Sequence, residues 1–207
     1  MFADLFFGFL QWLALLFIFS FHNYFKALVI TKLGDDTPKR LGFTTPNPLT
    51  HIDLIGTVIL PAILILAKSP LIIGWPKVIP VDYHRLKDPL KGALLITAFS
   101  LLAYFFISIL GLLGYYLLTN LDLPSNFNAL ILLFEFIFLM SAFFGFLNLL
   151  PIPPLDMGII LLVLLKKDVS LIEKYSAVGS LIILLLFFSG LINYLFHPIM
   201  KFLYSLL

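Results

Sequence analysis

The segment 20–36, SFHNYFKALVITKLGDD, ends a long apolar run and has polar residues at the spacing of a metal-binding helix. Residues i and i+4 of a helix lie on one face, so two histidines at that spacing can hold one zinc ion. A zinc protease adds a glutamate that takes a proton from zinc-bound water. Here His22 is present, but Asn23 cannot act as a base and the cationic Lys26 repels a metal ion. These residues alone favour a polar helix end over an intact metal site.

The composition predicts an integral membrane protein. Of the 207 residues, 61% are hydrophobic and 12% are charged, which is too apolar for a soluble domain. The absence of cysteine excludes thiolate ligands and disulfides. There is no basic stripe with interleaved aromatic residues, so nucleic acid is not an expected partner. The expected fold class is all-α: a polytopic bundle of about 4–6 transmembrane or re-entrant helices, forming a single integral membrane domain over residues 1–207.

Four apolar segments approach or exceed the roughly 20 residues that a span needs: 2–31, 92–118, 127–149 and 177–196. The first is expected to be a retained span, because its apolar run is too long for a cleaved signal. Two shorter apolar stretches, 54–67 and 159–165, leave full crossing open, and Pro61 interrupts the first of them.

Lysine and arginine predict the orientation, because they concentrate in cytoplasmic loops. Three loops are basic: 32–50, 68–91 and 166–174. Loop 119–126 has no lysine or arginine. If 54–67 enters the membrane and returns, all three basic loops face the cytoplasm. The first helix and the helix 127–149 would then both end at that face, which brings Lys26 and Asp156 to a similar depth.

Three further stretches follow in order: LGDDTPKRLGFTTPNPLTHIDLIGT (33–57), GWPKVIPVDYHRLKDP (74–89) and NLLPIPPLDMG (148–158). Together with the helix motif, they closely resemble the short bacterial branch of the site-2 protease family of intramembrane zinc metallopeptidases, over about residues 15–165. The resemblance implies a helical bundle around a zinc site near the cytoplasmic face of the bacterial membrane. It also implies an activity, the cleavage of transmembrane segments of other proteins.

By position, the resemblance assigns a role to each polar residue of the motif helix. His22 matches the first zinc histidine, Asn23 stands at the catalytic glutamate, and Lys26 stands at the second zinc histidine. Asp156 matches the third ligand, the aspartate of the family's Leu-Asp-Gly motif. The metal set is therefore vestigial, with His22 and Asp156 kept and the ligand at Lys26 lost.

Other positions match neighbours of the family's site. Asn148 matches an asparagine upstream of the ligand aspartate, and His51 and Asp53 match a stretch after the zinc helix. Two more motifs have changed: Met157 replaces a glycine, and FSLLAY at 99–104 replaces a small Gly-Pro-rich motif. We interpret the chain as a natural, catalytically degenerate homologue, a pseudoprotease without a cofactor that binds or regulates transmembrane segments or a membrane protein partner.

A carboxylate at this depth must be protonated, hydrated or paired. Lys26 takes the place of a metal ligand, so we predict an ion pair between Lys26 and Asp156 that replaces the charge of zinc. Two alternative functions stay open. One is an active zinc metallopeptidase with rearranged ligands, His22, Asp156 and His51. The other is a transporter or lipid-binding protein that reuses the cavity, with the intramembrane Glu135 as its one indication.

Overall fold

The computed structural model describes residues 2–69, 71–121, 124–165 and 170–207, and within these ranges the protein is helical with no strand. The α-helices are α1 (Phe2–Lys32), α2 (Thr37–Arg40), α3 (Leu60–Leu66), α4 (Pro89–Thr119), α5 (Asn128–Leu147), α6 (Asp156–Leu164), α7 (Ser170–Phe188) and α8 (Leu191–Tyr204). This confirms the predicted all-α fold class.

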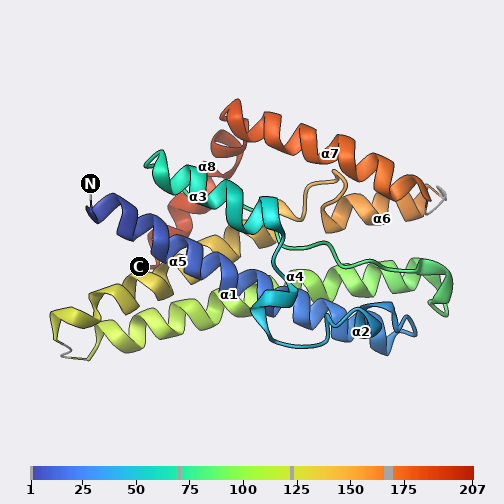
Figure 1. Cartoon of the computed structure of the whole chain (residues 1–207), viewed down its shortest axis with the longest axis horizontal. Helices are drawn as coiled ribbons and strands as arrows, with labels where there is room; N and C mark the ends of the chain where they lie inside the picture. The colour runs from blue at the N-terminus through green and yellow to red at the C-terminus, as the bar shows by residue number, and fades with distance from the viewer. Residues whose placement is uncertain (1, 70, 122–123, 166–169) are drawn as a thin grey trace.

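Helices α1, α4 and α5 are long and apolar enough to cross a membrane. At 1.5 Å per residue, the 31 residues of α4 extend about 46 Å, which exceeds a hydrocarbon thickness of about 30 Å. The three helices pack against one another along the length of the molecule (Figure 1). The chain is therefore an integral membrane protein, as its composition predicts.

The core lies where these three helices meet. It joins Leu15, Ile18 and Phe19 of α1 to Tyr104 of α4 and Phe144 of α5, all buried. Closely packed, interlocking side chains hold neighbouring helices in a fixed register. The polar residues of α1 and α4 are consequently held in fixed positions relative to each other.

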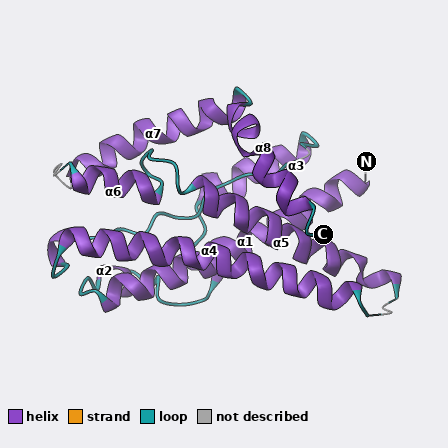
Figure 2. Cartoon of the chain, turned by 180° about the vertical axis from the view of Figure 1, so that it is seen from behind, coloured by secondary structure: helices purple, strands orange, loops and turns teal. Residues whose placement is uncertain are grey.

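The C-terminal region differs from its prediction. The single span expected at 177–196 is two helices, α7 and α8, which meet at an angle of 71°. Figure 2 shows α8 turning away from the end of α7. Gly190 lies at the break with φ of 77°, a left-handed conformation that glycine adopts without steric cost. Residues 166–169 of the predicted basic loop lie outside the described residues.

The short apolar stretch forms a π-helical turn, η2 (Leu54–Ile59), which continues into α3. Its 13 residues from Leu54 to Leu66 extend about 20 Å as a helix, less than the hydrocarbon thickness. Pro61 is the second residue of α3, and the carbonyl of Gly56, five residues before it, accepts a hydrogen bond from the backbone N–H of Trp75 at 3.2 Å. The length fits a segment that enters the membrane only part of the way, and the sidedness of its flanking loops stays a prediction.

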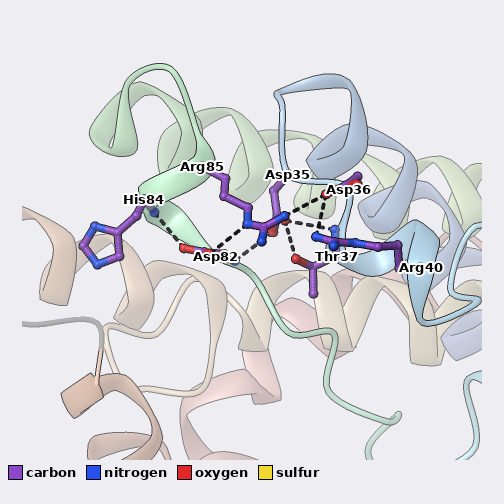
Figure 3. A network of polar contacts seen from close by, with 7 residues as sticks. All are labelled: Asp35, Asp36, Thr37, Arg40, Asp82, His84 and Arg85. Carbon is purple, nitrogen blue, oxygen red and sulfur yellow. Dashed lines mark hydrogen bonds and ion pairs between the residues drawn. The ribbon is translucent and has the colours of Figure 1, made fainter.

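A polar brace joins the loop after α1 to the loop before α4 (Figure 3). The buried Asp35 carboxylate accepts hydrogen bonds from the backbone N–H and hydroxyl of Thr37, at 3.0 and 2.5 Å. Its other oxygen accepts from the backbone N–H of Asp82 at 2.7 Å. On the exposed side, Arg85 bridges Asp36 and Asp82 at 3.0 and 3.1 Å. The brace fixes one end of the extended segment that passes the site described next.

Candidate functional site

Three helices contribute to one buried polar cluster. His22 and Asn23 lie one turn before Lys26 on α1, Ser100 comes from the middle of α4, and Asp156 begins α6. His22, Asn23, Ser100 and Asp156 are all buried. Polar side chains in such surroundings are expected to meet partners of their own.

Lys26 and Asp156 form the predicted ion pair. The Nζ of Lys26 contacts the Oδ1 of Asp156, with 19% of the lysine side chain and 4% of the aspartate side chain exposed. The second carboxylate oxygen accepts a hydrogen bond from the hydroxyl of Ser100 at 2.5 Å. Both oxygens of this buried carboxylate are thus engaged by the protein itself.

His22 is joined to the same serine. Its Nε2 lies 2.6 Å from the Oγ of Ser100, and its ring stacks on Tyr104 with centroids 3.9 Å apart. The Ser100 hydroxyl has one proton, which it donates to Asp156, so its oxygen accepts the bond from His22. The imidazole therefore bears its proton on Nε2, and its buried Nδ1 has no partner. A continuous chain of bonds runs from His22 through Ser100 and Asp156 to Lys26.

Asn23, which the sequence resemblance places at a catalytic glutamate, has a structural contact in this protein. Its Nδ2 donates to the backbone carbonyl of Lys77 at 2.7 Å. The N–H of Lys77 in turn donates to the carbonyl of His51 at 2.9 Å. Asn23 therefore anchors the extended segment that follows α3 against α1, and an amide cannot accept a proton as a carboxylate base would.

Asn148 positions Asp156. It caps the end of α5, where its Nδ2 donates to the carbonyl of Phe144 at 2.9 Å. Its Oδ1 accepts from the backbone N–H of Asp156 at 3.3 Å, and its carbonyl accepts from the N–H of Met157 at 3.1 Å. Thr97 adds a bond to the carbonyl of Asp156 at 3.3 Å. These contacts fix the first turn of α6 against α4 and α5.

His51 and Asp53 form hydrogen bonds within the segment between α2 and α3. The Nε2 of His51 lies 2.7 Å from the carbonyl of Thr45, and burial lowers the pKa of this histidine. Asp53 caps η2 through the backbone N–H groups of Ile55 and Gly56. As the structure describes them, neither residue shares a hydrogen bond with His22 or Asp156. A third ligand role for His51 stays a prediction.

The donor set does not fit a zinc ion. A catalytic zinc site has three protein ligands and an open position for water. Here the Nε2 of His22 is bonded to Ser100, and the ammonium of Lys26 contacts the Asp156 carboxylate, where a dication would lie. Across the described ranges, no three His, Cys, Asp or Glu side chains are grouped as metal ligands. No catalytic step through a metal follows from this arrangement.

Two contributors to the cluster were not found from the sequence. Ser100 and Tyr104 lie in the stretch 99–104, which was interpreted only as a lost motif. The sequence does contain an indication of their role, because a serine and a tyrosine at i and i+4 lie on one face of an apolar helix. Polar side chains inside a membrane usually form hydrogen bonds with a partner. The spacing does not say which helix supplies that partner.

One curated protein gives the family. The chain is 30% identical over 190 residues to the "Putative zinc metalloprotease YwhC" of Bacillus subtilis (strain 168). The matched region covers 88% of this chain and 82% of YwhC. The chain belongs to the YwhC family. No family-level sequence model matches it, and no solved structure matches it significantly. The name of this relative agrees with the metallopeptidase resemblance found in the sequence, while the polar cluster of this family member departs from a zinc centre.

A cavity of about 390 Å³ lies between α1, α5, α8 and the segment after α3. Its lining includes Gln11, Ile72, Met140, Phe144 and Phe196, all buried. Two polar residues of α8, Asn193 and His197, also line it and are exposed. Two of its walls, α1 and α5, are long and apolar enough to span a membrane. Glu135, which directly precedes the lining residue Phe136 on α5, is partly buried and takes no part in the polar cluster.

Proposed function

We propose that this member of the YwhC family is a site-2-protease-like protein of the bacterial cytoplasmic membrane that has lost proteolysis and binds transmembrane segments of other proteins. The observation that carries the proposal is the Lys26–Asp156 ion pair. A lysine on the ligand carboxylate supplies the charge that a metal would supply, but it has no open coordination position at which to activate water.

The chemistry of the cluster supports the loss of proteolysis. Amide hydrolysis by this class of site needs a metal-bound water and a base that takes its proton. General acid–base help contributes typically about 10²–10⁴-fold in rate, and Asn23 cannot give it. His22 is an unsuitable substitute, because its protonated Nε2 bonds Ser100 and its Nδ1 is buried.

The cavity between α1, α5 and α8 supports the binding of a transmembrane segment. If α8 enters the membrane beside α5, exposed polar side chains such as Asn193 and His197 are costly there unless they meet a hydrogen-bonding partner. A partner helix with its own polar side chain satisfies such groups across a helix–helix contact. The apolar side chains of the partner helix would pack against Met140 and Phe144, which line the cavity.

The unaltered, purified protein is expected to bind no stoichiometric zinc and to leave a transmembrane substrate uncut. Elemental analysis after zinc loading and dialysis measures the first outcome, and cleavage of a synthetic single-span substrate in liposomes measures the second. Adding a chelator should change nothing, because no metal-dependent step exists. Zinc-dependent cleavage that disappears in the His22→Ala variant would overturn the loss of proteolysis.

A photo-crosslinking amino acid at position 197 is expected to capture a synthetic transmembrane peptide of leucine and alanine with one central asparagine. The matched control is position 113, since Leu113 on α4 is 59% exposed and does not line the cavity. Crosslinking in liposomes should give a peptide adduct at 197 and only lipid adducts at 113. Equal peptide yields at both positions, or lipid adducts alone at 197, would contradict the proposed binding site.

A further inference from the structure

We propose that Ser100 has taken the bridging position between His22 and Asp156 that a metal ion would fill, so that its hydroxyl must be removed before this site can bind zinc tightly. The inference rests on the proposed function, because a site that already held zinc would leave Ser100 nothing to block. It adds a second blocking residue to Lys26.

The geometry around the Ser100 oxygen carries this inference. The side chain of Ser100 is fully buried. Its Oγ lies 2.6 Å from the Nε2 of His22 and 2.5 Å from the Oδ2 of Asp156. In a zinc centre, a histidine nitrogen and a carboxylate oxygen converge on one ion at about 2.0–2.2 Å. In this chain they converge on the serine oxygen, and two atoms cannot share that space.

Ser100 and Lys26 divide the two physical tasks of a metal. A hydroxyl donates one hydrogen bond and accepts others through a single atom, so it can join the Nε2–H of His22 to the carboxylate of Asp156. It has no net charge, and a buried carboxylate held by a hydroxyl alone would stay uncompensated. The ammonium of Lys26 supplies the charge on the other carboxylate oxygen.

The consequence is that restoring the helix motif of α1 should restore only weak metal binding. Asn23→Glu with Lys26→His rebuilds the two α1 positions, but His22 and Asp156 still face the serine oxygen. Removing the Ser100 hydroxyl in addition frees both donor atoms toward one point. Ser100→Ala is the suitable change, because alanine leaves out the hydroxyl and keeps the helix propensity of α4.

The experiment compares zinc affinity in three full-length variants that share Asn23→Glu and Lys26→His. One retains Ser100, one adds Ser100→Ala, and one adds Ser108→Ala as a matched control. Ser108 is also buried on α4, but its hydroxyl donates to the carbonyl of Phe138 at 2.9 Å, outside the cluster. Zinc competition against a chelator and the absorption spectrum of bound Co²⁺ are the readouts, with thermal unfolding of each variant as the folding check.

We expect the Ser100→Ala variant to bind zinc about 10–100-fold more tightly than the other two, the range typical when groups that orient metal ligands change. Equal affinity with and without Ser100, or no zinc binding even after Ser100→Ala, would overturn the bridging role. Zinc bound by the unaltered chain would instead overturn the proposed function, so the two failures are distinguishable.

If the triple variant does not fold, a second measurement on the otherwise unaltered chain decides. Nitrogen-15 chemical shifts of the His22 imidazole should change with Ser100→Ala, because its Nε2–H loses its acceptor. They should stay the same with Ser108→Ala. Unchanged shifts in the Ser100→Ala protein would overturn the assignment of the serine as the bridge.

Discussion

Replacing Lys26 with alanine is expected to lower the free energy of unfolding by about 3–5 kcal/mol, the cost of removing one partner of a buried ion pair. The loss is large because Asp156 is only 3% exposed and would keep a carboxylate without a counter-charge. Asp156→Ala should cost less, since the Lys26 side chain is 19% exposed and its ammonium can hydrate. Unfolding in detergent micelles by increasing denaturant measures both values.

The double variant tests whether the two side chains act as a pair. Lys26→Ala combined with Asp156→Ala should lose clearly less stability than the sum of the single changes, because neither charge is then left alone. Arg40→Ala is the control: it breaks the half-exposed contact with Asp36 at 2.8 Å, and exposed pairs contribute about 0–1 kcal/mol. Strict additivity for Lys26 and Asp156 would show that the lysine is only a charge at a helix end.

Asp35→Asn is expected to destabilise the protein by about 1–3 kcal/mol at pH 7, the cost of leaving a buried donor unsatisfied. The amide nitrogen of asparagine cannot accept the hydrogen bond from the N–H of Asp82 that the carboxylate accepts at 2.7 Å. Burial by itself would raise the pKa of Asp35, but the bonds from Thr37 and Asp82 hold that pKa below its usual value. The charged form is therefore the one that the fold stabilises (Figure 3).

The pH dependence of this difference follows from the lowered pKa. A carboxylate with a depressed folded-state pKa adds stability above its unfolded pKa of about 3.9, and that stability is lost as pH falls through the folded value. The difference in free energy of unfolding between the unaltered protein and Asp35→Asn should thus be largest at pH 7 and should decrease below about pH 4. Thermal unfolding in detergent measures it, with the half-exposed Asp36→Asn as control. A gap that persists unchanged to acidic pH would contradict a charged Asp35.

The spans could be predicted because their physical cause is local. In hydrocarbon every backbone N–H and C=O must be satisfied within the chain, so a long apolar run forms a helix whatever surrounds it. That argument gave α1, α4 and α5. It did not report the bend within 177–196, because hydropathy carries no information on chain direction, and the left-handed Gly190 divides that run into α7 and α8.

The sequence by itself determined that His22 and Lys26 share a face of α1, and that a carboxylate at Asp156 had to be protonated, hydrated or paired. Helical spacing fixes the first, and the cost of a bare charge in a membrane fixes the second. Only the tertiary structure decided that Ser100 lies between His22 and Asp156 and that Asn23 holds the backbone of Lys77. The physical reason is that spacing sets directions within one helix, whereas the side chain that fills the space between helices depends on how α1, α4 and α6 pack.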